Sequence, residues 1–166
     1  MIPVTTKNKL SMPVSDQSPP ANINEPGVLQ LIQPVRFALV DRFYREQGYK
    51  VKCGATERVY AIANEREQFI AATRLVPQSS GHYWLRNLLV ASAWRGQGIA
   101  TGLMQQLLPD LAPHSCYCFA LPHLTGFYTA LGFIQNPANC PEDIQRTYNT
   151  YRSRGRDWVL MGYSQV

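Results

Sequence analysis

Apolar residues recur along this chain at two spacings, one typical of helices and one typical of strands. Phe37, Val40 and Tyr44 recur at the spacing of one helix face. Pro34 before them and Gly48 after them suit the first position and the C-terminal cap of a helix. Helices are predicted at residues 34–48, 101–108, 123–132 and 141–151. Strands are predicted at residues 28–32, 58–63, 68–75, 82–90, 115–121 and 158–163, with one more beginning at Phe133.

Strand pairing follows from the connections between these elements. Residues 64–67 join two β-rich runs, which predicts a hairpin. Strand, helix and strand succeed one another over residues 82–121, which predicts a parallel pair with a right-handed crossover. Alternation along residues 82–90 predicts two distinct strand faces, as in an antiparallel sheet. One predicted face carries His82, Trp84, Arg86 and Leu88, and the other carries Tyr83, Leu85, Asn87 and Leu89.

The composition changes once along the chain, near residue 27. Residues 1–27 mix Pro, Ser, Asn and Thr without periodicity, and we expect a disordered or loosely packed leader there. Residues 28–166 are expected to form one domain, since a chain of 166 residues can bury a single core. No apolar run reaches transmembrane length and the N-terminus lacks the apolar core of a signal peptide. The expected compartment is therefore the cytoplasm.

Charge and cysteine content narrow the classes of function. The formal net charge of +5 fits a polyanionic ligand, RNA or an acidic protein surface. Cys53, Cys116, Cys118 and Cys140 show no Cys-x-x-Cys or Cys/His metal-ligand spacing. We therefore expect no metal site and four reduced, packed thiols. Cys116 and Cys118 are two residues apart in a predicted strand and should share one face of it.

A glycine-containing turn stands between the strand at residues 82–90 and the next helix. Its sequence is Arg95-Gly96-Gln97-Gly98-Ile99-Ala100, followed by Thr101. Small residues let a ligand approach the backbone, and the first amides of a helix have no intrahelical acceptor. With the positive end of the helix dipole, such amides form an anion site suited to a phosphate or pyrophosphate. The spacing matches neither the dinucleotide fingerprint nor the Walker loop.

Two motifs carry a resemblance to a known family. Arg95-x-x-Gly98-x-Ala100, preceded by Leu88-Leu89-Val90, resembles the acyl-CoA-binding motif of the GNAT superfamily of N-acyltransferases. Downstream, Phe127-Tyr128-x-x-Leu131-Gly132-Phe133 resembles the second signature of that superfamily, in which a tyrosine lies beside the CoA sulfur. The family often has an asparagine seven residues before this tyrosine. Leu121 stands there in this sequence and has no polar side-chain group for that contact.

The resemblance implies a fold, a donor and a set of site residues. It implies an α+β fold in α/β/α layers, with a mixed, mostly antiparallel central sheet, a splayed parallel strand pair and flanking helices. It implies acetyl-CoA as the acyl donor, a primary amine as the acceptor and Tyr128 as the catalytic residue. It also implies that a backbone amide at Val90 or its neighbour faces the thioester oxygen. The implied CoA-binding residues are Leu88, Leu89, Val90, Arg95, Gly96, Gln97, Gly98, Ile99, Ala100 and Thr101.

The acceptor and the general base stay open at the level of sequence. Candidate bases for deprotonating the amine are Glu57, Glu65, His82 and His123. The basic set near the C-terminus (Arg146, Arg152, Arg154 and Arg156) fits a solvated face, the 3′-phosphate of CoA or nucleic acid. The alternatives to an acetyltransferase of amines are a non-catalytic CoA-binding module and, ranked last, a toxin-like acetyltransferase acting on tRNA. No membrane partner is expected, and a homodimer is an expectation only.

Overall fold

A computed structural model describes residues 27–112 and 115–164, so the predicted leader at residues 1–27 lies outside it except for Gly27. The centre of the molecule is one seven-stranded sheet in the order β1-β2-β3-β4-β5-β7-β6. Neighbouring strands are antiparallel except for the parallel pair β4 and β5, which confirms the predicted fold class. The strands are β1 (Leu29–Ile32), β2 (Arg58–Ala63), β3 (Phe69–Pro77), β4 (Tyr83–Val90), β5 (Cys116–Ala120), β6 (Phe133–Gln135) and β7 (Val159–Tyr163).

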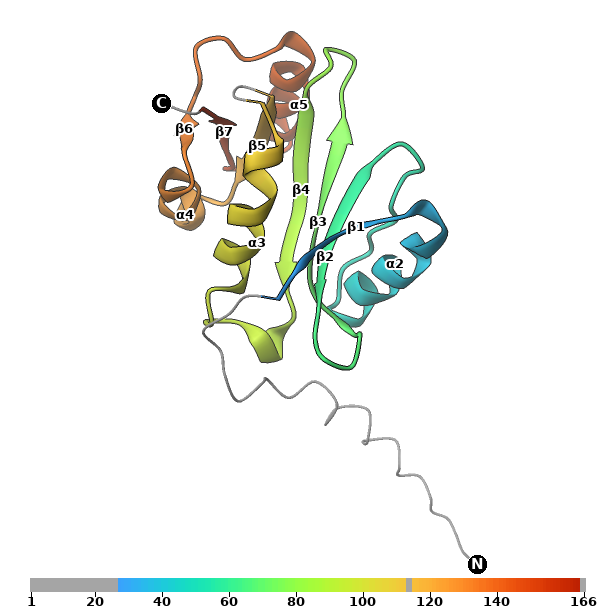
Figure 1. The fold of residues 1–166 in the computed structure, drawn as a ribbon. Coiled ribbons are helices and arrows are strands. Elements are labelled where there is room, and N and C mark those ends of the chain that lie inside the picture. The colour runs from blue at the N-terminus through green and yellow to red at the C-terminus, as the bar shows by residue number, and fades with distance from the viewer. Residues whose placement is uncertain (1–26, 113–114, 165–166) are drawn as a thin grey trace, which may run out of the picture.

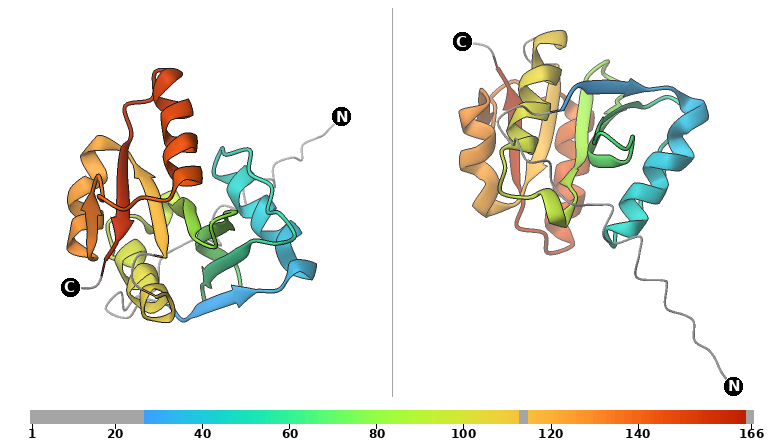
Figure 2. Two further views of the ribbon diagram at one scale, coloured as in Figure 1. Left: turned by 90° about the horizontal axis from the view of Figure 1, so that it is seen from above. Right: turned by 60° about the horizontal axis from the view of Figure 1, so that its bottom comes forward.

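Helices cover both faces of this sheet (Figures 1 and 2). Helices α3 (Ile99–Leu107) and α4 (Thr125–Ala130) pack against the face that buries Leu85 and Cys118. Helices α2 (Phe37–Glu46) and α5 (Glu142–Ser153) lie on the opposite face. The layered arrangement places the turn before α3 at the carboxyl end of β4.

The first predicted helix forms with a later start and an end two residues earlier than residues 34–48, and Gly48 caps it as predicted. Residues Pro34–Arg36 form a 3-10 turn, and the α-helix begins at Phe37 and ends at Glu46. The Gly48 backbone has a φ of +89°, the left-handed conformation that glycine adopts after a helix. Phe37, Val40 and Tyr44 are buried, as their spacing predicted.

The strict alternation predicted along residues 82–90 is wrong beyond Arg86, because β4 contains a bulge. Arg86 lies opposite Arg74, yet Leu89 lies opposite Ala72, so β4 has one residue more than β3 between these pairs. Arg74 and Ala72 share a face, and therefore Leu89 shares the face of Arg86 instead of opposing it. Asn87 has a φ of +54° within the bulge, a conformation that asparagine tolerates better than most residues.

Strands β4 and β5 stay together over only part of their length. Tyr83, Trp84 and Leu85 pair with residues 116–118, and no pair joins the two strands beyond Leu85. A bulge bends its strand and increases the local twist, and β5 turns its other edge to β7. The carboxyl halves of the parallel pair therefore separate, which opens the sheet where the turn before α3 begins.

Most buried side chains of the core are apolar, and its cysteines carry free thiols. Cys116 and Cys118 are both buried and share the α3 face, as their spacing predicted, and burial raises the pKa of the Cys116 thiol to about 12.

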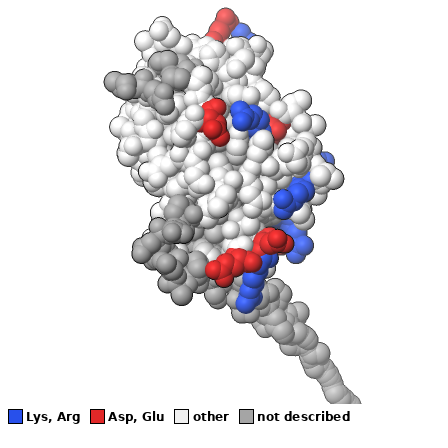
Figure 3. Space-filling model, viewed as in Figure 1, with Lys and Arg blue, Asp and Glu red and all other residues white. Residues whose placement is uncertain are grey.

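No helix in the described part of the chain is both long and apolar enough to cross a membrane. Charges of both signs are scattered over the face in Figure 3, and no continuous basic surface appears on it.

Candidate active site

Two adjoining cavities occupy the gap between β4 and β5. The first has a volume of about 280 Å³ and lies between residues 84–89 of β4 and residues 118–121 around the end of β5. The second has a volume of about 450 Å³ and extends to the turn before α3. Six residues line both, so the cavities form one groove that runs from the sheet to the turn. These are Tyr49, Leu88, Leu89, Leu121, Leu124 and Tyr128.

The turn at one end of this groove presents backbone amides. Gly96 and Gly98 both have a φ of +76°, which strains any residue with a side chain. The Gly102 amide donates the first helical hydrogen bond, 2.9 Å to the Gly98 carbonyl. The amides of Ile99, Ala100 and Thr101 consequently have no acceptor within the helix. With the dipole of α3, they make this end of the groove favourable for an anion.

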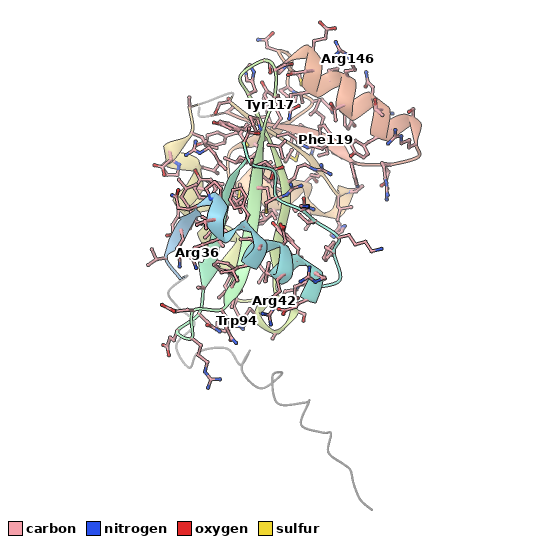
Figure 4. The ribbon with its side chains drawn as sticks, turned by 90° about the vertical axis from the view of Figure 1, so that its right-hand side faces the viewer. Arg36, Arg42, Trp94, Tyr117, Phe119 and Arg146 are labelled. Carbon is pink, nitrogen blue, oxygen red and sulfur yellow. The ribbon has the colours of Figure 1, made fainter. Side chains whose placement is uncertain are left out.

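Trp94 adds an unpaired donor beside the same turn. It lies at the end of the sheet where β4 finishes (Figure 4) and lines the second cavity. Its side chain is buried, and its indole Nε1 has no hydrogen-bond partner among the described residues. Arg95 is also anchored here, because its Nε donates to the Val90 carbonyl oxygen at 3.0 Å.

The Val90 amide faces the gap between the parallel strands. The Ala91 amide donates to the Ile70 carbonyl at 2.7 Å, which makes Val90 and Ala71 a pair without hydrogen bonds between them. The amide of Val90 therefore points away from β3, toward the side where β5 has separated. It is a fixed donor on the wall of the second cavity, directly after Leu88 and Leu89, which line both cavities.

Tyr128 lies across the gap on α4 and lines both cavities. Its ring packs edge-on against Phe127 and Phe133, at centroid distances of 5.0 and 5.4 Å. The residue is 7% exposed, and its hydroxyl has no hydrogen-bond partner within residues 27–112 and 115–164. Burial raises the pKa of Tyr128 above its ordinary value, so the hydroxyl keeps its proton at neutral pH.

A buried polar network supports the bulge in β4. Arg74 Nη1 contacts both carboxylate oxygens of Glu57 at 2.8 Å, and Arg74 Nη2 donates to Asn87 Oδ1 at 2.8 Å. The Tyr44 hydroxyl donates to the Asn87 carbonyl at 2.7 Å. The α2 helix, β3 and the loop before β2 thus hold the strained backbone of Asn87 in place.

A sequence model of the acetyltransferase (GNAT) family matches residues 29–133. This chain belongs to that family. The match includes every residue that lines the two cavities except Trp158, and it ends at the first residue of β6. Members of the GNAT family are typically N-acetyltransferases that depend on acetyl-CoA.

Solved structures share the fold at low sequence identity. A Mycobacterium tuberculosis protein crystallised with CoA and a second ligand is 12% identical, with a TM-score of 0.60 over 84% of this chain and 99% of that one. N-acetylglutamate synthase from Neisseria gonorrhoeae, crystallised with CoA and N-acetyl-glutamate, is 13% identical, with a TM-score of 0.58 over 84% of this chain and 36% of that one. The GNAT protein YhbS from Escherichia coli, in complex with CoA, is 18% identical, with a TM-score of 0.51 over 66% of this chain and 69% of that one. No protein in the curated set matches the chain.

Most of the residues that the sequence predicts for the site lie together in this groove. The residues that line at least one cavity are Leu88, Leu89, Val90, Arg95, Gly96, Gly98, Ile99, Ala100, Thr101 and Tyr128. Gln97 belongs to the same turn but does not line either cavity.

The four candidate bases do not line the groove. Glu57 is held in the buried ion pair with Arg74, and Glu65 is exposed in the turn between β2 and β3. His82 precedes β4 at its far end, with its Nδ1 2.9 Å from Ser80 Oγ. His123 is exposed in the 3-10 turn before α4.

Sequence reasoning missed the other wall of the first cavity. Arg86, Trp84, Phe119 and Trp158 line it together with Tyr49. The sequence placed Arg86 and Trp84 on one strand face and Trp158 at the start of a strand, but it gave no reason to assign any of the three to this cavity. The one local signal for this part of the cavity was Asn87, which also lines it. Asparagine tolerates a positive φ, and its presence is compatible with the bulge that shapes β4 here.

We expect Glu57→Gln to destabilise the protein by about 3 kcal/mol, because it leaves the buried Arg74 charge without its carboxylate. Urea unfolding followed by circular dichroism measures this. Glu65→Gln is the matched control, since Glu65 is exposed, and its free energy of unfolding should change by about 0.5 kcal/mol or less. Equal stability of the two variants would show that the ion pair does not support the fold.

Proposed function

We propose that this protein is an N-acetyltransferase that transfers an acetyl group from acetyl-CoA to a primary amine by direct attack. One observation carries the proposal: a single groove joins the free amides of the first turn of α3, the Val90 amide and the protonated hydroxyl of Tyr128. We assign the activity to residues 28–166, and we expect a chain that lacks residues 1–27 to retain it.

The residues of the turn fit the diphosphate of CoA. The amides of Ile99, Ala100 and Thr101 lack helical acceptors, and the Arg95 side chain lies at the same turn. The Thr101 hydroxyl is a further donor on the cavity wall. In this assignment the glycines at 96 and 98 leave the surface of the turn open to the ligand, and the leucines at 88 and 89 flank its pantetheine arm.

Acetyl-CoA supplies an activated acetyl group: the amine nitrogen forms a bond to the acetyl carbon, the carbon–sulfur bond breaks, and the amine proton finally resides on the released thiol. The Val90 amide is directed to stabilise negative charge on the acetyl oxygen during this exchange. Tyr128 offers a neutral O–H to the departing sulfur. Because its pKa is raised, the hydroxyl is a weak acid. We therefore assign it mainly a hydrogen bond to the sulfur, and proton transfer only as a secondary role.

The groove residues that the structure describes include no carboxylate and no imidazole. An amine with a reference pKa near 10.4, like that of lysine, is mostly protonated at neutral pH. We therefore propose that the amine loses its proton to water before attack. The rate should then rise with pH between about 7 and 9 for such acceptors.

Incubation with acetyl-CoA and a panel of primary amines, with CoA and acetylated amine separated chromatographically, tests this function. Chromatography is preferable to a thiol reagent because the protein has four free cysteines of its own. We expect equal amounts of the two products with at least one amine. Binding of acetyl-CoA without turnover across the panel would favour the non-catalytic module. Acetylation confined to aminoacyl-tRNA would favour the tRNA-directed enzyme.

A further inference from the structure

Arg86 is the one arginine of β4, and it lines the first cavity, away from the turn before α3. Its side chain is half-buried on the face of the sheet that α2 and α5 cover. The guanidinium carbon lies 4.1 Å from the centroid of the Trp84 ring, and the Tyr151 side chain lies near the guanidinium. The head group is thus held against an aromatic face.

The charge of Arg86 has no carboxylate partner within the described residues. The nearby carboxylate of Glu57 is already bound by both of its oxygens to Arg74. Burial lowers the pKa of the Arg86 guanidinium, which reports that its positive charge is poorly hydrated. A guanidinium stays protonated in proteins, so this charge favours an anion that enters the cavity.

Aromatic side chains form the rest of this wall. The Trp84 ring lies 4.8 Å from Phe119 and 5.9 Å from Tyr151, measured between centroids. The Tyr151 ring in turn lies 5.0 Å from that of Trp158. Phe119 lies between the sheet and α5 in Figure 4. Such a surface favours an apolar or aromatic body beside the charged group.

We propose that the acceptor is an amine that also carries a carboxylate and an apolar or aromatic body, as in an amino acid. This inference rests on the proposed acetyl transfer. Arg86 binds the carboxylate by charge-assisted hydrogen bonds, and the aromatic wall contacts the body. The amine then lies toward Leu88 and Leu89, where the first cavity meets the second.

Matched substrates test the role of Arg86. Phenylalanine and phenylalaninamide, and tryptophan and tryptophanamide, differ at the carboxyl group, which is a charged carboxylate in one member of each pair and a neutral carboxamide in the other. For each pair the ratio of kcat/KM (carboxylate over carboxamide) is compared between the wild type and Arg86→Gln. Because the intrinsic reactivity of each substrate is the same with both proteins, the change in ratio isolates the contact with Arg86. We expect this ratio to fall by about tenfold or more, the range for a charge-assisted hydrogen bond.

Arg58→Gln is the matched control. The Arg58 guanidinium also lies near aromatic rings, 5.5 Å from that of Tyr60 and 5.7 Å from that of Tyr83, but Arg58 does not line the groove. Its ratio should equal that of the wild type. Arg86→Lys should keep part of the preference for the carboxylate, because it keeps the charge without the planar fork.

A binding measurement separates this inference from the proposed function. N-acetylphenylalanine and its carboxamide are titrated in the presence of CoA, and the fluorescence of the cavity tryptophans is followed. Tighter binding of the carboxylate that disappears in Arg86→Gln, without any turnover, would support the carboxylate site and overturn the transferase. Turnover of amines with no preference for the carboxylate, or with a preference unchanged in Arg86→Gln, would overturn the carboxylate site and leave the transferase standing.

Discussion

Tyr128→Phe should lower kcat for acetyl transfer by about a hundredfold or more, the range for loss of a positioned proton donor. The Kd for CoA should change by less than about twofold, because the ring that packs on Phe127 and Phe133 is retained. The effect is confined to kcat because the hydroxyl acts on the departing sulfur and has no protein partner to lose among the described residues. Steady-state kinetics and calorimetric titration with CoA measure the two quantities.

The pH profile of the wild type adds a second readout for Tyr128. Its pKa is raised above the ordinary value of 10.0, so its proton is retained across the accessible alkaline range. Below about pH 10, the rate of the wild type should therefore not fall because Tyr128 loses its proton. The profiles of the wild type and Tyr128→Phe should have the same shape in this range.

Tyr117→Phe is the control for this experiment. Tyr117 is as deeply buried as Tyr128 but belongs to the cluster on the α5 face and does not line the groove. Its removal should leave kcat within about twofold of the wild type. Equal kcat for Tyr128→Phe and the wild type would remove Tyr128 from the mechanism.

Gly98→Ala should weaken CoA binding by about tenfold or more, equivalent to loss of one hydrogen bond to a charged group. A Cβ at Gly98 would meet no protein atom within 4 Å, so the substitution fills space that the groove leaves open. The φ of +76° also penalises a side chain, and relaxation of that strain would turn the following amides from their present direction. Calorimetry with CoA measures the loss.

Gly81→Ala separates strain from ligand contact. Gly81 has a φ of +85° and equally open space, but it lies before β4, at the opposite end of the strand. Both variants should lose about 1 kcal/mol of stability, since the backbone cost is the same. Only Gly98→Ala should lose CoA affinity. Equal CoA binding by both variants would contradict the assignment of the turn.

Local sequence patterns were sufficient for most of the fold. Gly48 and Gly132 end their helices in the positive-φ conformation that their positions suggested. The strand–helix–strand succession gave the parallel pair, and the turn with Gly96 and Gly98 formed between β4 and α3. Each of these features depends on neighbouring residues, which is why it could be predicted from the sequence.

The features that sequence could not predict depend on distant contacts. The bulge at Asn87 is held by Tyr44 and Arg74, residues of α2 and β3. Glu57 is a carboxylate like any other in the sequence, and only the fold places it against Arg74. The insertion of β7 between β5 and β6 likewise brings together strands that are far apart in the chain.

A crystal structure of the protein with CoA bound tests the central claim most directly. The account predicts the diphosphate within hydrogen-bond distance of the amides between residues 96 and 101. It also predicts that the sulfur lies between β4 and β5, beside the Tyr128 hydroxyl. A nucleotide bound elsewhere, with the turn before α3 free of contact, would contradict it.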